Sequence, residues 1–429
     1  MKLLLKGGRI IDPAQNVDLV GDVLVQDGRI AKVGGQIDPG DAEVLEARGL
    51  VVAPGLIDLH THLREPGLEA KEDIGSGTRA AAAGGFTTIC CMPNTRPVID
   101  NAVLVAGVTQ RAGLEGAVNV RVIGALTKGQ EGKELAEIGD MIAAGAVALS
   151  DDGHFVESAR IFRTGLEYAG MFDGVVVSHA EDESLAGDGY MHEGAVSAAL
   201  GLRGRPAVSE DIAVARDVML AEYTGALLHI AHVSTLGAVE IIRQAKRRGV
   251  RVTAEVTPHH LTLTDEAVLG FDPAAKVHPP LRSGEHVEAL LAGLKDGTLD
   301  VIATDHAPHA FEEKDVEFRY APSGFAGLET ALGVVLTELY HTGKFTLPEL
   351  IDRMAAAPAR VFGLEGGTLK PGAPADITLF DPNQEWRVDS SLFYTRGKCT
   401  PFAGKSLKGK AVATIVGGRV VMKNGEVRA

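Results

Sequence analysis

The chain has 429 residues, 45% of them hydrophobic and 23% charged, and its formal net charge is −15. This length allows one large and one smaller domain, and the composition is ordinary for a soluble globular protein. The negative charge argues against nucleic acid or an anionic membrane as the main partner. Three cysteines without zinc-finger spacing, together with the lack of a signal-peptide pattern or a membrane-length apolar run, predict a cytoplasmic protein without disulfides.

The two ends of the chain both look like β structure. Residues 1–53 contain short apolar or alternating runs at 3–5, 22–25 and 30–33, separated by glycine-containing turns. Residues 369–429 repeat this pattern at 375–380 and 411–416. Neither end has enough strands for a comfortable sandwich alone, so we expect the two ends to pair into one small β-sandwich domain.

Residues 54–368 alternate between strand-like and helix-like stretches. Helix-like stretches at 77–83, 135–144, 212–223 and 237–248 separate most of the strand candidates. The strand candidates are the short apolar runs 56–60, 86–91, 119–123, 146–150, 174–179, 226–232, 250–256 and 300–305. Eight such runs predict an α/β fold, a parallel (β/α)8 TIM-like barrel that forms the catalytic domain.

Many of the predicted strands end in a reactive side chain. These residues are His60, His62, Asn94, Asp151, Asp152, His179, His232, His259, His260 and Asp305. The carboxyl ends of barrel strands meet at one mouth, so residues over 240 positions apart would become neighbours there. His60 and His62 are two residues apart, so on a strand they share a face and can bind one metal ion together.

The histidines and carboxylates at these ends suit two divalent cations such as zinc. A carboxylate between the metals could bridge them, and a metal-activated water could attack a carbonyl while an aspartate transfers its proton. The set therefore predicts hydrolysis of an amide-like C–N bond. Arg64 would share the face of the metal pair if the strand continues, and would bind either a substrate carboxylate or a structural acid. Asn94 could hold a turn, and His309 could contact substrate or lie at the surface.

Four segments carry a resemblance to a known family. They are HTHLREPG at 60–67, MPNT at 92–95, AEVTPHH at 254–260 and ATDHAPH at 303–309. Over nearly the whole chain the sequence resembles the cyclic amidohydrolases, and among them the dihydroorotases of the long bacterial type. The resemblance implies a zinc-dependent enzyme that reversibly hydrolyses (S)-dihydroorotate to N-carbamoyl-L-aspartate in de novo pyrimidine (UMP) biosynthesis.

The resemblance also implies roles for individual residues. His60 and His62 would hold one Zn²⁺ close to Asp305, and His179 and His232 would hold a second. Many relatives bridge their metals with a carboxylated lysine, but here Asp151 and Asp152 stand at that strand end. Alignment with the long bacterial type favours Asp152 as the bridge, with one metal site weaker than the other. Asp305 would be the catalytic proton shuttle, and the substrate would contact His62, Arg64, Asn94, His278, His309, Ser323 and Gly324. His278 stands where the family usually has asparagine.

Two other functions are compatible with the same barrel. A hydantoinase, dihydropyrimidinase or allantoinase would share the histidines but should carry the bridging lysine and lack the Arg64 and Asn94 pair. A non-catalytic subunit that scaffolds aspartate transcarbamoylase should have lost metal ligands, and none is lost here. The expected partners are the small-molecule substrate, a second copy in a homodimer and aspartate transcarbamoylase, with no nucleic acid and no membrane.

Overall fold

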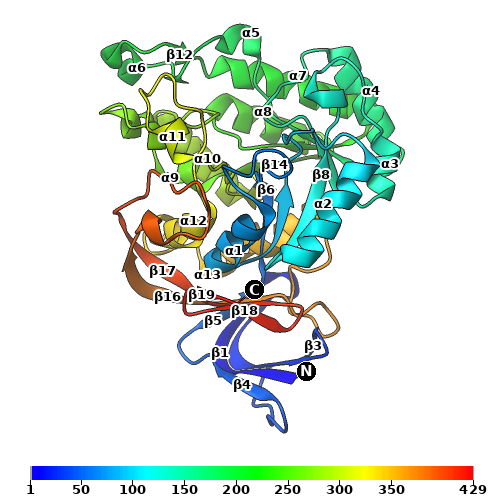
Figure 1. Ribbon diagram of the computed structural model, residues 1–429, viewed down its shortest axis with the longest axis vertical. Helices are drawn as coiled ribbons and strands as arrows, with labels where there is room; N and C mark the ends of the chain where they lie inside the picture. The colour runs from blue at the N-terminus through cyan, green and yellow to red at the C-terminus, as the bar shows by residue number, and fades with distance from the viewer. Residues whose placement is uncertain (1, 429) are drawn as a thin grey trace.

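Eight parallel strands form a barrel in the computed structural model, which describes residues 2–428 (Figure 1). The strands are β6 (Leu56–Thr61), β7 (Phe86–Cys91), β8 (Asn119–Gly124), β9 (Ala148–Ser150), β10 (Val175–Ser178), β13 (Leu227–Ile230), β14 (Val252–Val256) and β15 (Val301–Ile302). Thr61 forms an isolated parallel bridge with His306, so the chain just after β15 returns to β6. The predicted barrel is confirmed, and each strand lies within or next to its predicted run.

Helices alternate with these strands and cover the barrel (Figure 1). The longer ones are α1 (Ile74–Gly84), α2 (Ala102–Glu115), α4 (Ala159–Gly170), α7 (Val208–Thr224), α8 (Leu236–Arg247), α10 (Gly284–Asp296) and α12 (Leu328–Val335), and the six-residue helix α3 (Ile138–Ala143) precedes β9. Shorter elements are α5 (Glu183–Ala186), α6 (Ala195–Leu200), α9 (Pro258–Thr262), α11 (Phe311–Lys314), α13 (Leu347–Ile351), α14 (Ala357–Phe362), β11 (Met191–His192) and β12 (Gly204–Arg205). Local signals start these helices: the Asp73 side chain caps α1 and the Thr235 side chain caps α8.

The lumen of the barrel is filled with apolar side chains. One buried cluster contains Ile57, Cys90, Ile123 and Val301, which come from four different strands, together with Phe362 of α14. Side chains from so many strands can meet only inside the barrel. Because this packed lumen fixes the strands, the loops that follow them are carried on a rigid platform.

Strands from both ends of the chain form a second sheet, which lies below the barrel in Figure 1. They are β1 (Lys2–Asp12), β2 (Val17–Gln26), β3 (Arg29–Val33), β4 (Glu43–Glu46), β5 (Val51–Pro54), β16 (Ile377–Arg387), β17 (Ser406–Val416), β18 (Arg419–Lys423) and β19 (Glu426–Val427). β5 pairs antiparallel with β16, and Leu3, Val25, Ile377 and Ile415 share one buried core. The predicted pairing of the two ends is confirmed, in the form of one continuous sheet.

The domain limits predicted at residues 53 and 368 stay predictions; β5 ends at Pro54 and β16 begins at Ile377. Within residues 2–428, no helix combines the length and the apolar character needed to cross a membrane.

Candidate metal centre

His60 in β6 and His62 just after this strand are each held by a hydrogen bond at the ring nitrogen Nδ1. His60 Nδ1 lies 2.6 Å from Glu255 Oε1, and His62 Nδ1 lies 2.8 Å from Asn94 Oδ1. Both oxygens accept hydrogen bonds, so each Nδ1 carries the hydrogen and each Nε2 presents a lone pair. The two Nε2 atoms are therefore prepared to bind a cation.

These two lone pairs face two carboxylates. His62 Nε2 lies 3.1 Å from Asp305 Oδ1 and 3.5 Å from Asp152 Oδ2. His60 Nε2 lies 3.5 Å from Asp305 Oδ1 and 3.4 Å from Asp152 Oδ1. The strand ends that the sequence predicted to converge therefore do meet at one mouth.

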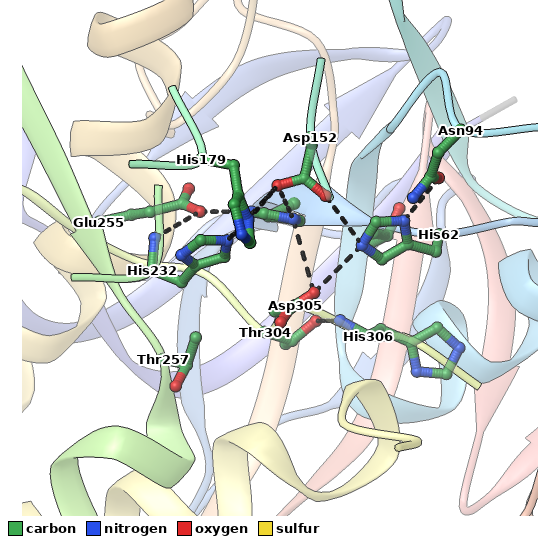
Figure 2. Close-up of polar contacts among 12 residues, drawn as sticks. His62, Asn94, Asp152, His179, His232, Glu255, Thr257, Thr304, Asp305 and His306 are labelled. Atoms are coloured by element: carbon green, nitrogen blue, oxygen red, sulfur yellow. Dashed lines mark hydrogen bonds and ion pairs between the residues drawn. The ribbon is translucent and has the colours of Figure 1, made fainter. Parts of the chain in front are cut away.

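Two further histidines approach Asp152 from the other side, as Figure 2 shows. His179 Nδ1 and His232 Nε2 lie 2.9 Å apart, and they lie 3.5 Å and 3.4 Å from Asp152 Oδ1. Asp152 thus contacts all four histidines and lies between the two pairs. A carboxylate in this place can bridge two cations.

Asp151, the neighbouring candidate for the bridge, points elsewhere. Its Oδ1 accepts hydrogen bonds from the backbone N–H groups of Leu126 and Thr127, both at 2.9 Å. Asp151 therefore fixes the loop after β8, and the structure places Asp152 rather than Asp151 among the histidines.

The donor set fits divalent metal ions. The side chains of this cluster are at most 6% exposed, yet His60 Nε2 and Asp152 Oδ1 form no hydrogen bond with the described residues. Burial alone would lower the pKa of His60, but the carboxylates of Asp152 and Glu255 raise it well above its ordinary value. The carboxylates thus favour a positively charged partner. Burying polar atoms that have no hydrogen-bond partner costs free energy of folding. Donor atoms of His60, His62 and Asp305 lie within 4.8 Å of one another, as do those of His60, Asp152 and His232.

A cavity of about 160 Å³ opens onto this cluster, and Arg64 lines it. The strand ends at Thr61, and Arg64 has a φ of 61°, so it reaches the cavity through a left-handed turn rather than by continuing the strand. Its Nε donates to the carbonyl of Pro308 at 3.3 Å, and it forms no ion pair with any described carboxylate. Its terminal amino groups are thus available for a ligand carboxylate.

The other predicted substrate contacts line the same cavity. The Nε2 of His309 lies 2.8 Å from the carbonyl of Ser323, and Gly324 N–H donates to the carbonyl of Lys276 at 2.9 Å. Burial, reinforced by the charge of Arg64, lowers the pKa of His309 to about 3, so this ring is neutral at physiological pH. These contacts hold the loop that contains Ser323 and Gly324 against the cavity.

His278 also lines the cavity and belongs to a charged cluster. Its ring packs edge-on against the ring of His179, with centroids 4.6 Å apart, and its Nε2 lies 2.9 Å from a guanidinium nitrogen of Arg205. The carboxylate of Glu181 contacts both His278 and Arg205. The side chain at this position thus connects the short strand β12 to the histidines of the centre.

Glu255 and the pair of Glu181 and Arg205 were not predicted as site residues from the sequence. Glu255 orients His60, and its other oxygen lies 3.2 Å from His229 Nε2. A signal for Glu255 was present, because an acid stands inside the otherwise apolar run 250–256. The sequence around Arg205 has no comparable feature, because its partners Glu181 and His278 come from distant loops.

The chain is similar in sequence to known dihydroorotases and to the amidohydrolase family. The family model described as "Dihydro-orotase-like" matches residues 49–237, and the one described as "Amidohydrolase family" matches residues 223–422. A dihydroorotase of Pelotomaculum thermopropionicum is 57% identical over 428 residues, covering all of both chains, and one of Geobacter metallireducens is 53% identical, covering 99% of this chain and all of its own. Among solved structures, the L-hydantoinase of Arthrobacter aurescens has a TM-score of 0.89 at 29% identity, covering all of this chain and 97% of its own.

The two adjacent aspartates should respond differently to substitution. Replacing Asp152 by alanine should remove about one metal ion per chain, because the donors on both sides lose their shared anion. Replacing Asp151 by alanine should leave the metal content unchanged but lower the free energy of unfolding by about 1–3 kcal/mol, because two buried N–H groups lose their acceptor. Elemental analysis and chemical denaturation of both variants measure these effects. Metal loss from the Asp151 variant alone would contradict the assignment.

Proposed function

The chain belongs to the dihydroorotases of the amidohydrolase superfamily, and from this premise we propose that it reversibly hydrolyses (S)-dihydroorotate to N-carbamoyl-L-aspartate in pyrimidine biosynthesis. The observation that carries the proposal is that a guanidinium group without an acid partner and a cluster of histidines and aspartates line one small cavity. The first can bind the substrate carboxylate, and the second can hydrolyse the ring amide beside it.

We further propose that the cofactor is Zn²⁺, with two ions per subunit. His60 and His62 would hold one ion close to Asp305, His179 and His232 would hold the second, and Asp152 would bridge them, with one site the weaker. When bound, the ions would supply a water of lowered pKa and would polarise the carbonyl of the substrate.

In this proposal Asp305 is the residue that moves the proton. Its carboxylate would accept a proton from the attacking water as the water oxygen bonds to the ring carbonyl carbon. The bond from that carbon to the ring nitrogen then breaks, and Asp305 would return the proton to the nitrogen. Asp305 starts ionised and can therefore accept a proton, because burial, which would raise the pKa of its carboxyl, is outweighed by His60 and His62, which lower it.

The remaining residues would bind and orient the substrate. Arg64 would pair with its carboxylate, and the amide nitrogen of Asn94 is available because the Asn94 oxygen faces His62. We assign His278, His309, Ser323 and Gly324 to the ring on the grounds that they line the same cavity. The cavity is smaller than the roughly 300–1,000 Å³ typical of drug-sized ligands, so a compact ring suits it.

Parallel turnover assays test the function. The purified, zinc-loaded protein should hydrolyse dihydroorotate with a kcat/KM at least tenfold above that for hydantoin. A preference for hydantoin would favour a hydantoinase, and loss of turnover on both compounds would indicate a non-catalytic subunit. Homodimer formation, association with aspartate transcarbamoylase and a cytoplasmic location are parts of the proposal that rest on the sequence alone.

Substitution of Asp305 by asparagine should lower kcat by about 10²–10⁴-fold, because an amide cannot accept the proton of the water. The KM for dihydroorotate should change little, since Arg64 still binds its carboxylate. Steady-state kinetics on protein of verified metal content measure both constants. A near-normal kcat would remove Asp305 from the proton-transfer role.

Substitution of Arg64 by methionine should act on one substrate and spare another. For dihydroorotate, kcat/KM should fall by an amount worth roughly 2–5 kcal/mol, because a charge-assisted pair is lost from a dehydrated cavity. Dihydrouracil, which lacks the carboxylate, should be affected far less. Equal losses on both compounds, measured side by side, would mean that Arg64 supports the fold rather than the substrate.

A further inference from the structure

The barrel closes through very little backbone pairing between its first and last strands. β15 has two residues, and beyond its end the chain joins β6 through the isolated bridge from His306 to Thr61 and the hydrogen bond from His62 N–H to the carbonyl of His306, at 2.8 Å. Asp305, the proposed proton shuttle, lies at this junction. Its distance from His60 and His62 therefore depends on how firmly the two strands are joined.

A buried side chain joins the strands where backbone pairing is sparse. Asp58 of β6 is fully buried, and its Oδ1 accepts from Thr304 N–H at 3.0 Å and from His60 N–H at 3.1 Å. Its Oδ2 accepts from the Thr304 hydroxyl at 2.5 Å. One carboxylate thus binds both the strand of the first histidine pair and the residue before Asp305.

The Thr304 hydroxyl continues this connection around Asp305. Its oxygen also accepts from His306 N–H at 3.0 Å, so it bridges over Asp305 from one neighbour to the other (Figure 2). Asp305 itself has a φ of 49°, a left-handed conformation that is unfavourable for a residue with a side chain. Such a conformation persists only where its surroundings enforce it, and the Asp58–Thr304 contact is suited to do so.

We propose that Asp58, acting through Thr304, is a positioning residue that holds the Asp305 carboxylate at its proton-transfer distance from the substrate. The inference rests on the proposed function, because it assigns a purpose to the placement of Asp305. Neither Thr304 nor Asp58 lines the cavity. Their effect should appear in kcat, since a shift of about 1 Å in a reacting group can cost on the order of 10²-fold in rate.

The chain offers a matched control for the Thr304 hydroxyl. Thr378 is also buried, and its hydroxyl likewise accepts from one backbone N–H, that of Leu56 at 3.1 Å, and donates to one oxygen, the carbonyl of Gly85 at 2.6 Å. Leu56 begins β6, so Thr378 lies at the opposite end of that strand from the metal centre. Substituting either threonine by valine removes one buried hydroxyl with the same number of hydrogen bonds.

The experiment compares Thr304→Val, Thr304→Ser and Thr378→Val by Tm, metal content, kcat and KM for dihydroorotate. We expect both valine variants to lose a few degrees of Tm. Only Thr304→Val should lose kcat, at least tenfold, with KM within threefold of the unchanged protein and full metal content. Thr304→Ser keeps the hydroxyl and should retain kcat within about threefold. If Thr304→Val does not fold, Thr304→Ala removes the same hydroxyl with less crowding and should show the same pattern.

Three results would overturn the inference. A kcat of Thr304→Val equal to that of Thr378→Val would mean that the contact is only structural. Loss of metal from Thr304→Val would mean that the contact acts on metal binding rather than on Asp305. Lack of turnover in the unchanged, metal-loaded protein would overturn the proposed function and the positioning role together, whereas the first two results leave the proposed function standing.

Discussion

The centre depends on electrostatic attraction among side chains that are buried at the mouth of the barrel. Four imidazoles and two carboxylates are buried together at the barrel mouth, and this set of donor atoms could hold cations. The surrounding hydrogen bonds fix these donors beforehand: Glu255 orients His60, and Asn94 orients His62. Because the ligands are already oriented, less binding energy is spent on ordering them.

Sequence patterns predicted the parts of this molecule that are set locally. Apolar runs give the barrel strands because a parallel strand is buried on both faces, and His60 and His62 follow from their places at a strand end. The strand-end position alone left Asp151 and Asp152 both open, and the family resemblance favoured Asp152, which lies among the histidines. Glu255 was not assigned, because its partner His60 is 195 residues away and the two meet only when the barrel closes. An arginine does not by itself indicate a left-handed backbone conformation, so the turn at Arg64 was not predicted. The side chain lines the predicted cavity, but from this turn rather than from a continued strand.

The barrel itself does not determine which ring is opened. The L-hydantoinase of Arthrobacter aurescens shares the fold at a TM-score of 0.89, although only 29% of the residues are identical. The fold alone therefore does not set specificity, and the side chains that line the cavity beside the histidines and aspartates include Arg64, Asn94 and His278. His278 binds Arg205 and Glu181 instead of standing alone, so its effect includes the loop that carries them.

The sheet built from both ends of the chain has a consequence for synthesis on the ribosome. β5 ends at Pro54, but its partner β16 begins at Ile377, so the early strands leave the exit tunnel long before that partner exists. At roughly 5–20 residues per second, the interval is on the order of half a minute. During this time the edge of β5 that will pair with β16 is exposed. The residues of β5 are buried in the folded protein, and such an unpaired edge favours aggregation or chaperone binding. The sheet made from both ends of the chain can therefore be completed only after the whole barrel has been synthesised.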